Sequence, residues 1–137
     1  MSWLVDTCIL LDILDADSTF GAASARTIDR LSPDGLEISP VTSVELAPAF
    51  YGDFRRQEDF LRGLGIMVSS SWDIAARRAA EAAWAAHIDA KRKGLAAKKP
   101  IADVLIGALA LRHDGLVTRH PADFRRHYPS LRIVEPD

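Results

Sequence analysis

Two acidic residues occupy positions where a carboxylate can do chemistry as well as carry charge. Asp6 follows the apolar run 3–5 and precedes another, residues 9–11. An ionised carboxylate between two buried runs is costly unless something neutralises it. Asp103 is the only charged residue from position 101 to 111. It falls in the first turn of a predicted helix, where the helix dipole alone can also favour an acid.

Two further acids follow the same pattern. Glu45 lies near the start of another predicted helix, and Asp123 follows a predicted strand. Each has an ordinary explanation, as a solvated surface acid or as a helix cap. Parallel strands bring their carboxyl ends to one edge, so all four acids are expected to meet there. Crowded carboxylates raise one another's pKa unless a cation lies among them, and hard oxygen ligands suit Mg²⁺ or Mn²⁺. Asp12 is a weaker candidate, because it lies a full turn or more past the strand end.

The elements that must position these acids alternate along the chain. Short apolar runs predict strands at 3–5, 36–38, 66–68, 116–118 and 131–134. Helical patterns predict helices at 9–14, 20–31, from 42 or 43, 55–62, 72–93, from 100 to Gly115, and 124–127. This alternation predicts an α/β fold with a central parallel sheet of four to five strands and helices on both faces. Pro48 is expected to kink or stop its helix, and Gly107 to allow close packing beside Asp103.

The composition of the chain is typical of a single globular domain. The chain has 137 residues, is 48% hydrophobic and 26% charged, and has a net charge of −2. These values predict one globular domain over residues 1–137, without a strong electrostatic partner. The single cysteine, Cys8, excludes an internal disulfide. No signal peptide and no membrane span are expected, which favours the cytoplasm.

In order and spacing, several segments resemble the PIN-domain family, in particular the VapC-like ribonuclease toxins. The segments are LVDT at 4–7, LLD at 10–12, VEL at 44–46, ADVLIGA at 102–108, VTR at 117–119 and DF at 123–124. The resemblance covers nearly the whole chain. It implies a three-layer α/β/α fold, Mg²⁺- or Mn²⁺-dependent RNA cleavage by metal-activated water, a homodimer and a cognate antitoxin. It also implies a catalytic metal site of Asp6, Glu45, Asp103 and Asp123, supported by the hydroxyls of Thr7 and Thr118.

This sequence departs from the family pattern at three positions. Cys8 stands where a small polar residue is usual, and a packing role is favoured for it. His120 stands where an asparagine is common, which affects the local hydrogen bonding. Pro48 can shift the helix that carries Glu45. None of the three removes an acid.

An RNA substrate needs cations along its backbone. Arg119, Arg125 and Arg126 are nearest to the predicted site and are expected to contact phosphates. A second basic run contains Lys91, Arg92, Lys93, Lys98 and Lys99. For that run we favour a helix C-terminus followed by a solvated loop. The histidines are scattered and show no metal-binding spacing.

Three alternatives remain open from the sequence. A receiver domain would need adjacent acids near the first strand and a lysine after a late one, where Thr118 and Arg119 stand. A haloacid-dehalogenase-type phosphatase would need a second aspartate at the position of Cys8. The third alternative is a Mg²⁺-binding module without catalysis, which metal titration paired with an RNA cleavage assay would separate from an enzyme.

Overall fold

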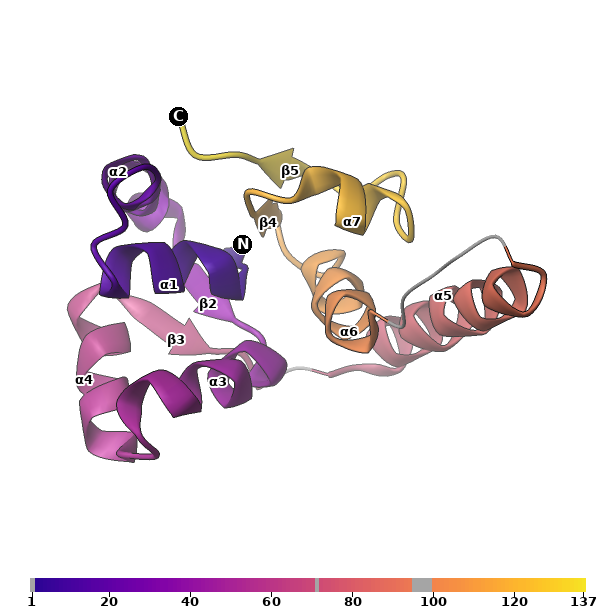
Figure 1. The fold of residues 1–137 in the computed structure, drawn as a ribbon, viewed down its shortest axis with the longest axis horizontal. Coiled ribbons are helices and arrows are strands. Elements are labelled where there is room, and N and C mark those ends of the chain that lie inside the picture. The colour runs from indigo at the N-terminus through magenta and orange to yellow at the C-terminus, as the bar shows by residue number, and fades with distance from the viewer. Residues whose placement is uncertain (1, 71, 95–99) are drawn as a thin grey trace.

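Five short parallel strands form one sheet with the order β3-β2-β1-β4-β5 (Figure 1). The structure is a computed structural model that describes residues 2–70, 72–94 and 100–137. The strands are β1 (Trp3–Val5), β2 (Leu36–Ile38), β3 (Ile66–Val68), β4 (Gly115–Val117) and β5 (Ile133–Val134). The first strand is central, with Leu4 opposite Glu37 of β2 on one side and Leu116 of β4 on the other. The predicted parallel α/β fold is confirmed.

Helices connect the strands and cover both faces of the sheet. They are α1 (Thr7–Leu14), α2 (Gly21–Leu31), α3 (Pro40–Leu46), α4 (Phe54–Gly63), α5 (Ile74–Arg92), α6 (Ile101–Ala110) and α7 (Pro121–Arg125). Two 3₁₀ turns, η1 (Ser32–Asp34) and η2 (Ala47–Phe50), complete the elements. Figure 1 shows α5 reaching outward past the rest of the molecule, alongside α6 only at its beginning.

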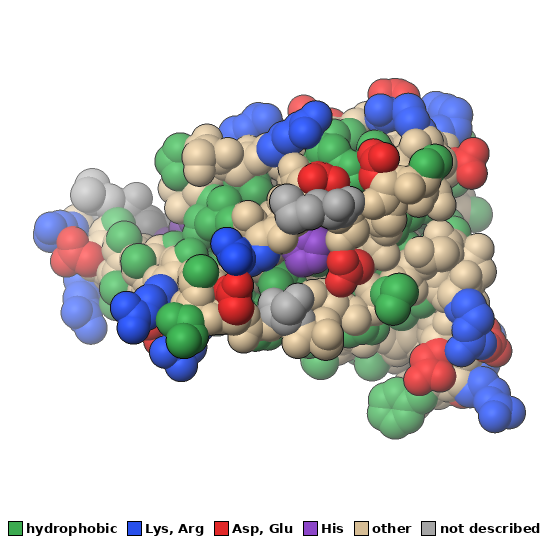
Figure 2. Space-filling view, turned by 180° about the vertical axis from the view of Figure 1, so that it is seen from behind, with side chains coloured by type: hydrophobic (Ala, Val, Ile, Leu, Met, Phe, Trp, Pro, Cys, Tyr) green, Lys and Arg blue, Asp and Glu red, His purple; other side chains and the backbone are tan. Residues whose placement is uncertain are grey.

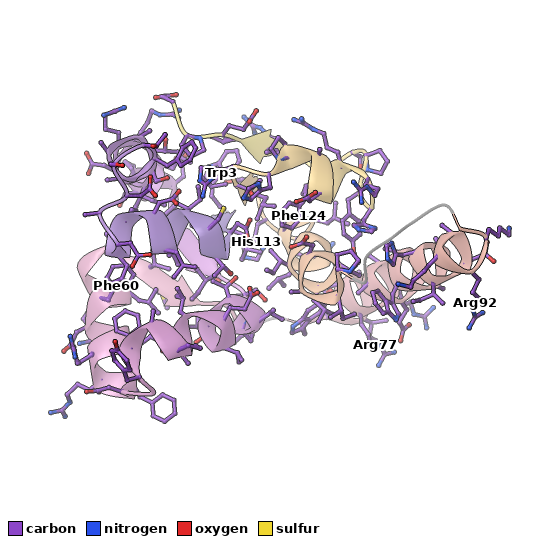
Figure 3. The ribbon with its side chains drawn as sticks, viewed as in Figure 1. Trp3, Phe60, Arg77, Arg92, His113 and Phe124 are labelled. Carbon is purple, nitrogen blue, oxygen red and sulfur yellow. The ribbon has the colours of Figure 1, made fainter. Side chains whose placement is uncertain are left out.

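Successive side chains of a strand point to opposite faces of the sheet, so the side chains of β1 enter two separate hydrophobic cores. Trp3 and Val5 pack with residues of α1, α2, α3 and α4. Leu4 packs with residues of α5, α6 and α7. Figure 3 shows Phe60 directed inward from α4 and Phe124 between α7 and α6, one aromatic ring in each layer of helices. The sheet is therefore the middle layer of three.

Helix α3 begins earlier than the sequence pattern predicts. It starts at Pro40, and the hydroxyl of Ser39 accepts from the backbone N–H of Val41 at 3.0 Å. Proline suits a first helical position because its ring fixes φ and its missing N–H is not needed there. The sequence pattern had placed this start at residue 42 or 43. The helix ends at Leu46, and Pro48 lies in the first turn of η2, so the expected early stop occurs.

Gly107 does allow close packing on α6, and the side chain that packs against it is Tyr128. A Cβ atom at this position would lie 2.6 Å from two ring carbons of Tyr128. The Tyr128 hydroxyl donates to the carbonyl oxygen of Val104 at 2.6 Å. The missing side chain thus lets a tyrosine ring lie against α6 and bond to its backbone. Sequence spacing gives the face of the helix but not what covers it, so the close packing could be predicted and Tyr128 could not.

The surface carries both signs of charge in mixture. Figure 2 shows acidic and basic side chains interspersed over one face, among hydrophobic ones. Within residues 2–70, 72–94 and 100–137, no helix combines the length and apolar character needed to span a bilayer.

Candidate metal centre

Asp6 lies where β1 ends and α1 begins, with only 6% of its surface exposed. Its Oδ1 accepts from the backbone N–H of Thr7 at 2.8 Å, and its Oδ2 accepts from the Thr118 hydroxyl at 2.7 Å. The thiol of Cys8 also donates to Oδ2, at 3.4 Å. Burial raises the pKa of Asp6, and these three hydrogen bonds oppose that rise. The carboxylate is thus held in one orientation by groups from α1 and from the end of β4.

Asp103 connects the four predicted acids electrostatically. Its pKa is raised to about 6, first by burial and then by the negative charges of Asp6, Asp123 and Glu45. Asp6, Asp123 and Glu45 therefore each lie within electrostatic reach of Asp103, although they come from the end of β1, from α7 and from α3. Charge on His120 acts in the opposite direction. A divalent cation would relieve this repulsion.

Glu45 is exposed, but its side chain is tied to α1. The Thr7 hydroxyl donates to Glu45 Oε1 at 2.7 Å and lies 3.0 Å from the hydroxyl of Thr42. Thr7 and Thr42 are both buried. These contacts join the start of α1 to α3, so Thr7 positions Glu45 as Thr118 positions Asp6.

The donor chemistry suits a hard cation, but the side chains do not yet form a complete coordination shell. In the parts of the chain that the structure describes, no three Asp, Glu, His or Cys side chains are placed to hold a metal ion together. Asp123, in the first turn of α7, and Glu45 are both exposed. Their side chains can therefore turn toward Asp103 without disturbing the core. Carboxylate oxygens and unneutralised charge fit Mg²⁺ or Mn²⁺.

The departures at Cys8 and His120 both affect hydrogen bonds around Asp6. Burial and the charge of Asp6 raise the pKa of the Cys8 thiol to about 12, so it stays protonated and acts as a donor. The backbone N–H of His120 donates to the Thr118 hydroxyl at 3.0 Å. Sequence reasoning found a packing role for Cys8 but missed its hydrogen bond to the carboxylate.

The three predicted phosphate contacts differ in their surroundings. Arg125 and Arg126 are exposed at the end of α7, beside Asp123. Arg119, in contrast, is bonded through Nε and Nη2 to Asp12, at 2.6 and 2.9 Å. Asp12 was a weak metal-site candidate because it lies a full turn or more past the strand end, and nothing in the sequence signals its ion pair with Arg119. RNA contacts by the three arginines stay predictions.

The structure describes only part of the second basic run, residues 91–93. Lys93 pairs with Asp89 at 3.0 Å near the C-terminus of α5. Lys98 and Lys99 lie outside the described residues.

Comparison with known proteins identifies relatives of this fold. The structure is similar to VapBC2 from Rickettsia felis bound to a promoter DNA fragment, with a TM-score of 0.70, 15% identity and 100% of both chains covered. It is also similar to FitAB bound to an IR36 DNA fragment, with a TM-score of 0.66, 18% identity, and 97% of this chain and 94% of that chain covered. No curated protein matches the sequence. At these identities the likeness shows the fold.

The family itself is shown by the sequence. The PIN domain family matches residues 3–128, which include the four acids and the two hydroxyls that position them. Through this match over most of its length, the chain belongs to the PIN-domain family.

Proposed function

We propose that this protein is a metal-dependent endoribonuclease, the toxin of a toxin–antitoxin pair. The observation that carries the proposal is the half-buried Asp103, whose pKa is raised first by burial and then by the charges of Asp6, Asp123 and Glu45 near it. Membership of the PIN-domain family supports nuclease chemistry. The structures named above supply the support for the toxin–antitoxin part.

Each residue of the proposed metal site has a role that follows from its position. Asp103 and Asp6 are the inner ligands, and the exposed Glu45 and Asp123 complete the site from its rim. Thr7 and Thr118 hold two of these carboxylates by hydrogen bonds of 2.7 Å each. Bound Mg²⁺ or Mn²⁺ would supply a water of lowered pKa and stabilise the leaving oxygen of a phosphodiester. Arg125 and Arg126 are placed to contact the RNA backbone.

We expect purified protein to cleave RNA only when Mg²⁺ or Mn²⁺ is present, because the bound metal ion would lower the pKa of the attacking water and stabilise the leaving oxygen. Expression in a bacterium, with mapping of new RNA 5′ ends, would locate the cleavage sites. The Asp6→Asn variant serves as the comparison, since it keeps the shape of the side chain. If wild type binds metal and leaves RNA intact, the protein is a non-catalytic binding module.

A cognate antitoxin is expected to cover the acidic site. Nuclease activity in a cell requires control, and an arginine side chain suits a site lined by carboxylates. Co-purification with the product of the neighbouring gene should suppress RNA cleavage. Unchanged cleavage in the presence of that partner would remove the regulatory half of the proposal.

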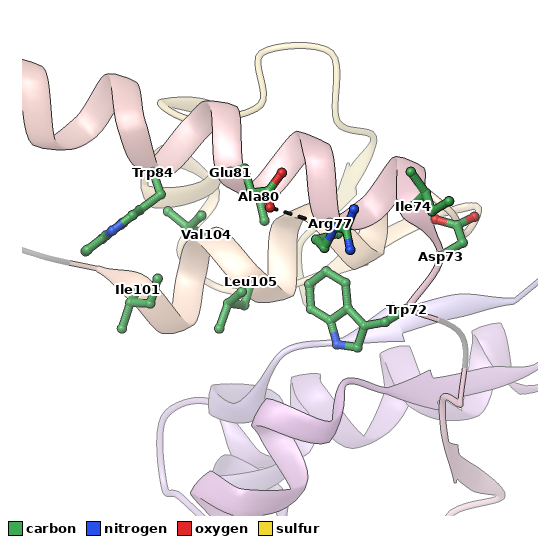
Figure 4. Close-up of a pocket in the computed structure, with 10 residues that line it drawn as sticks. All are labelled: Trp72, Asp73, Ile74, Arg77, Ala80, Glu81, Trp84, Ile101, Val104 and Leu105. Carbon is green, nitrogen blue, oxygen red and sulfur yellow. Dashed lines mark ion pairs between the residues drawn. The ribbon is translucent and has the colours of Figure 1, made fainter.

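A homodimer is also part of the proposal, supported by an apolar groove of about 410 Å³ between α5 and α6 (Figure 4). Its exposed hydrophobic members include Trp72, Ile74 and Ile101. Arg77 and Glu81, 3.7 Å apart, lie along the same groove and offer both signs of charge. A two-fold axis brings such a surface against itself and can pair these charges across the interface.

Light scattering at micromolar concentration should give about twice the chain mass of 15.0 kDa. Ile74→Glu should shift the mass toward that of the monomer, because it places a charge in the groove. Met67→Glu is the matched control, because Met67 is 71% exposed but lies on β3, outside the groove. A monomeric wild type, or equal effects of the two variants, would refute this interface.

A further inference from the structure

An ion pair between the buried Asp12 and the partly buried Arg119 lies beside the candidate metal centre. Asp12, in the second turn of α1, is 5% exposed and accepts two hydrogen bonds from Arg119 and one from the Ser24 hydroxyl at 3.1 Å. The guanidinium of Arg119 also lies over the ring of Phe20, 4.1 Å from its centroid. Two parallel bonds to one carboxylate fix the plane of the guanidinium as well as its position.

The backbone position of Arg119 links this pair to Asp6. Arg119 stands between Thr118, which donates to Asp6 Oδ2 at 2.7 Å, and His120, whose N–H donates to the Thr118 hydroxyl at 3.0 Å. Asp12 is on the helix that Asp6 caps. The contacts therefore form a closed ring, from Asp6 along α1 to Asp12, across to Arg119, and back through Thr118.

We propose that Asp12 is a positioning residue that acts through Arg119 to aim the Thr118 hydroxyl at Asp6. A buried ion pair is weak evidence for stability, since desolvation offsets its attraction. Its value here is geometric, because it fixes the turn that orients one carboxylate of the metal site. This inference rests on the proposed metal site, and it gives Arg119 a different role from the expected contact with RNA phosphate.

The test is Mn²⁺ affinity measured by calorimetry without RNA, on wild type and on three variants. Asp12→Asn removes the charge with little change in shape, and Arg119→Lys keeps the charge but loses the two-pronged contact. Each should weaken Mn²⁺ binding by about 10-fold, the lower end of the usual cost of losing a partner behind a metal ligand, because neither side chain contacts a ligand itself. The double variant should bind no more weakly than the weaker single, because both changes break one contact.

Asp59→Asn is the control, because it removes an exposed ion pair with Arg62, on α4. It should leave Mn²⁺ affinity unchanged. Thermal unfolding without metal shows whether each variant folds. If Asp12→Asn does not fold, the Mn²⁺ affinity of Arg119→Lys alone tests the positioning role. In RNA cleavage, the positioning role lowers kcat and leaves KM unchanged for both single variants.

The opposite pattern would overturn the proposal. If Arg119 serves RNA phosphate directly, Arg119→Lys raises KM, Asp12→Asn does not, and Mn²⁺ affinity is the same in all variants. Wild type that binds Mn²⁺ but cleaves no RNA defeats the proposed function, while the affinity series still decides the role of Asp12. Wild type that binds neither Mn²⁺ nor Mg²⁺ defeats both.

Discussion

Replacing Asp103 by asparagine is expected to reduce RNA cleavage by more than about 100-fold, beyond the usual cost of losing a partner behind a metal ligand. Asparagine keeps the shape of the side chain but removes one negative charge from a group of four. The charge carried by the ligands sets how tightly Mg²⁺ is held, so metal affinity should fall together with activity. Stability without metal should not fall at neutral pH, because asparagine removes both the cost of burying the charge and its repulsion by the neighbouring acids, the two causes that raise the pKa of Asp103.

Initial cleavage rates and thermal unfolding, each with and without Mg²⁺, measure these effects. Asp89→Asn is a suitable control, because Asp89 is also a helical acid but pairs with Lys93 on the exposed side of α5. Normal cleavage by Asp103→Asn, or an undiminished gain in melting temperature from Mg²⁺, would leave Asp103 as an ordinary first-turn acid.

Mg²⁺ is expected to stabilise the wild-type protein more at about pH 7.5 than at about pH 5. A metal ligand must be deprotonated, and with a pKa of about 6 only about a tenth of Asp103 is ionised at the lower pH. Affinity should thus be about tenfold weaker there. At a fixed excess of Mg²⁺, the stabilisation would be smaller by about 1.4 kcal/mol, which corresponds to several degrees in melting temperature.

Without metal, the contribution of Asp103 to folding stability should fall as pH rises, whereas the stabilisation by Mg²⁺ increases with pH. Its folded-state pKa, about 6, lies above the ordinary value of 3.8, so between these values the folded state binds more protons than the unfolded state. Stability from this group is therefore lost as pH rises through that window. For a carboxylate that is only half buried, the loss is on the order of 1 kcal/mol after solvent screening.

The difference between wild type and Asp103→Asn isolates this contribution, since His127, whose pKa is lowered by burial, acts in the other direction in both proteins. Melting curves across the pH range, with Mg²⁺ or with a chelator, give the slope of stability against pH with metal and without it. Equal slopes for wild type and Asp103→Asn would show that Asp103 does not have a raised pKa in the folded protein.

Much of the fold could be predicted because its signals are local. The apolar runs gave β1, β2 and β3 with the bounds that the structure has. The last two strands were less accurate: β4 is shifted by one residue, and β5 is reduced to Ile133–Val134. An apolar run marks the neighbourhood of a strand but not its ends. A single domain over residues 1–137 stays a prediction.

The candidate site was predictable in its acids but not in what holds them. Asp6 and Asp103 are recognisable because each is a charge within apolar sequence. The Arg119 pair with Asp12 joins residues more than 100 positions apart, and neither spacing nor composition reports such a contact. The thiol of Cys8 was equally hidden, because a small buried side chain looks the same in sequence whether or not it donates a hydrogen bond.

The separation of the two cores has a consequence for protein synthesis. All buried members of the first core except Val117 come from residues 3–66, whereas the second core, apart from Leu4, is built from residues 80–131. A ribosome therefore releases nearly all of the first core before the second exists, and domains can begin to fold during translation. Asp6 and Glu45 belong to the early half, and Asp103 and Asp123 to the late half. A nascent chain shorter than about 100 residues thus carries only two of the four acids of the proposed site, and the proposed nuclease cannot act on the messenger being translated until Asp123 has been made.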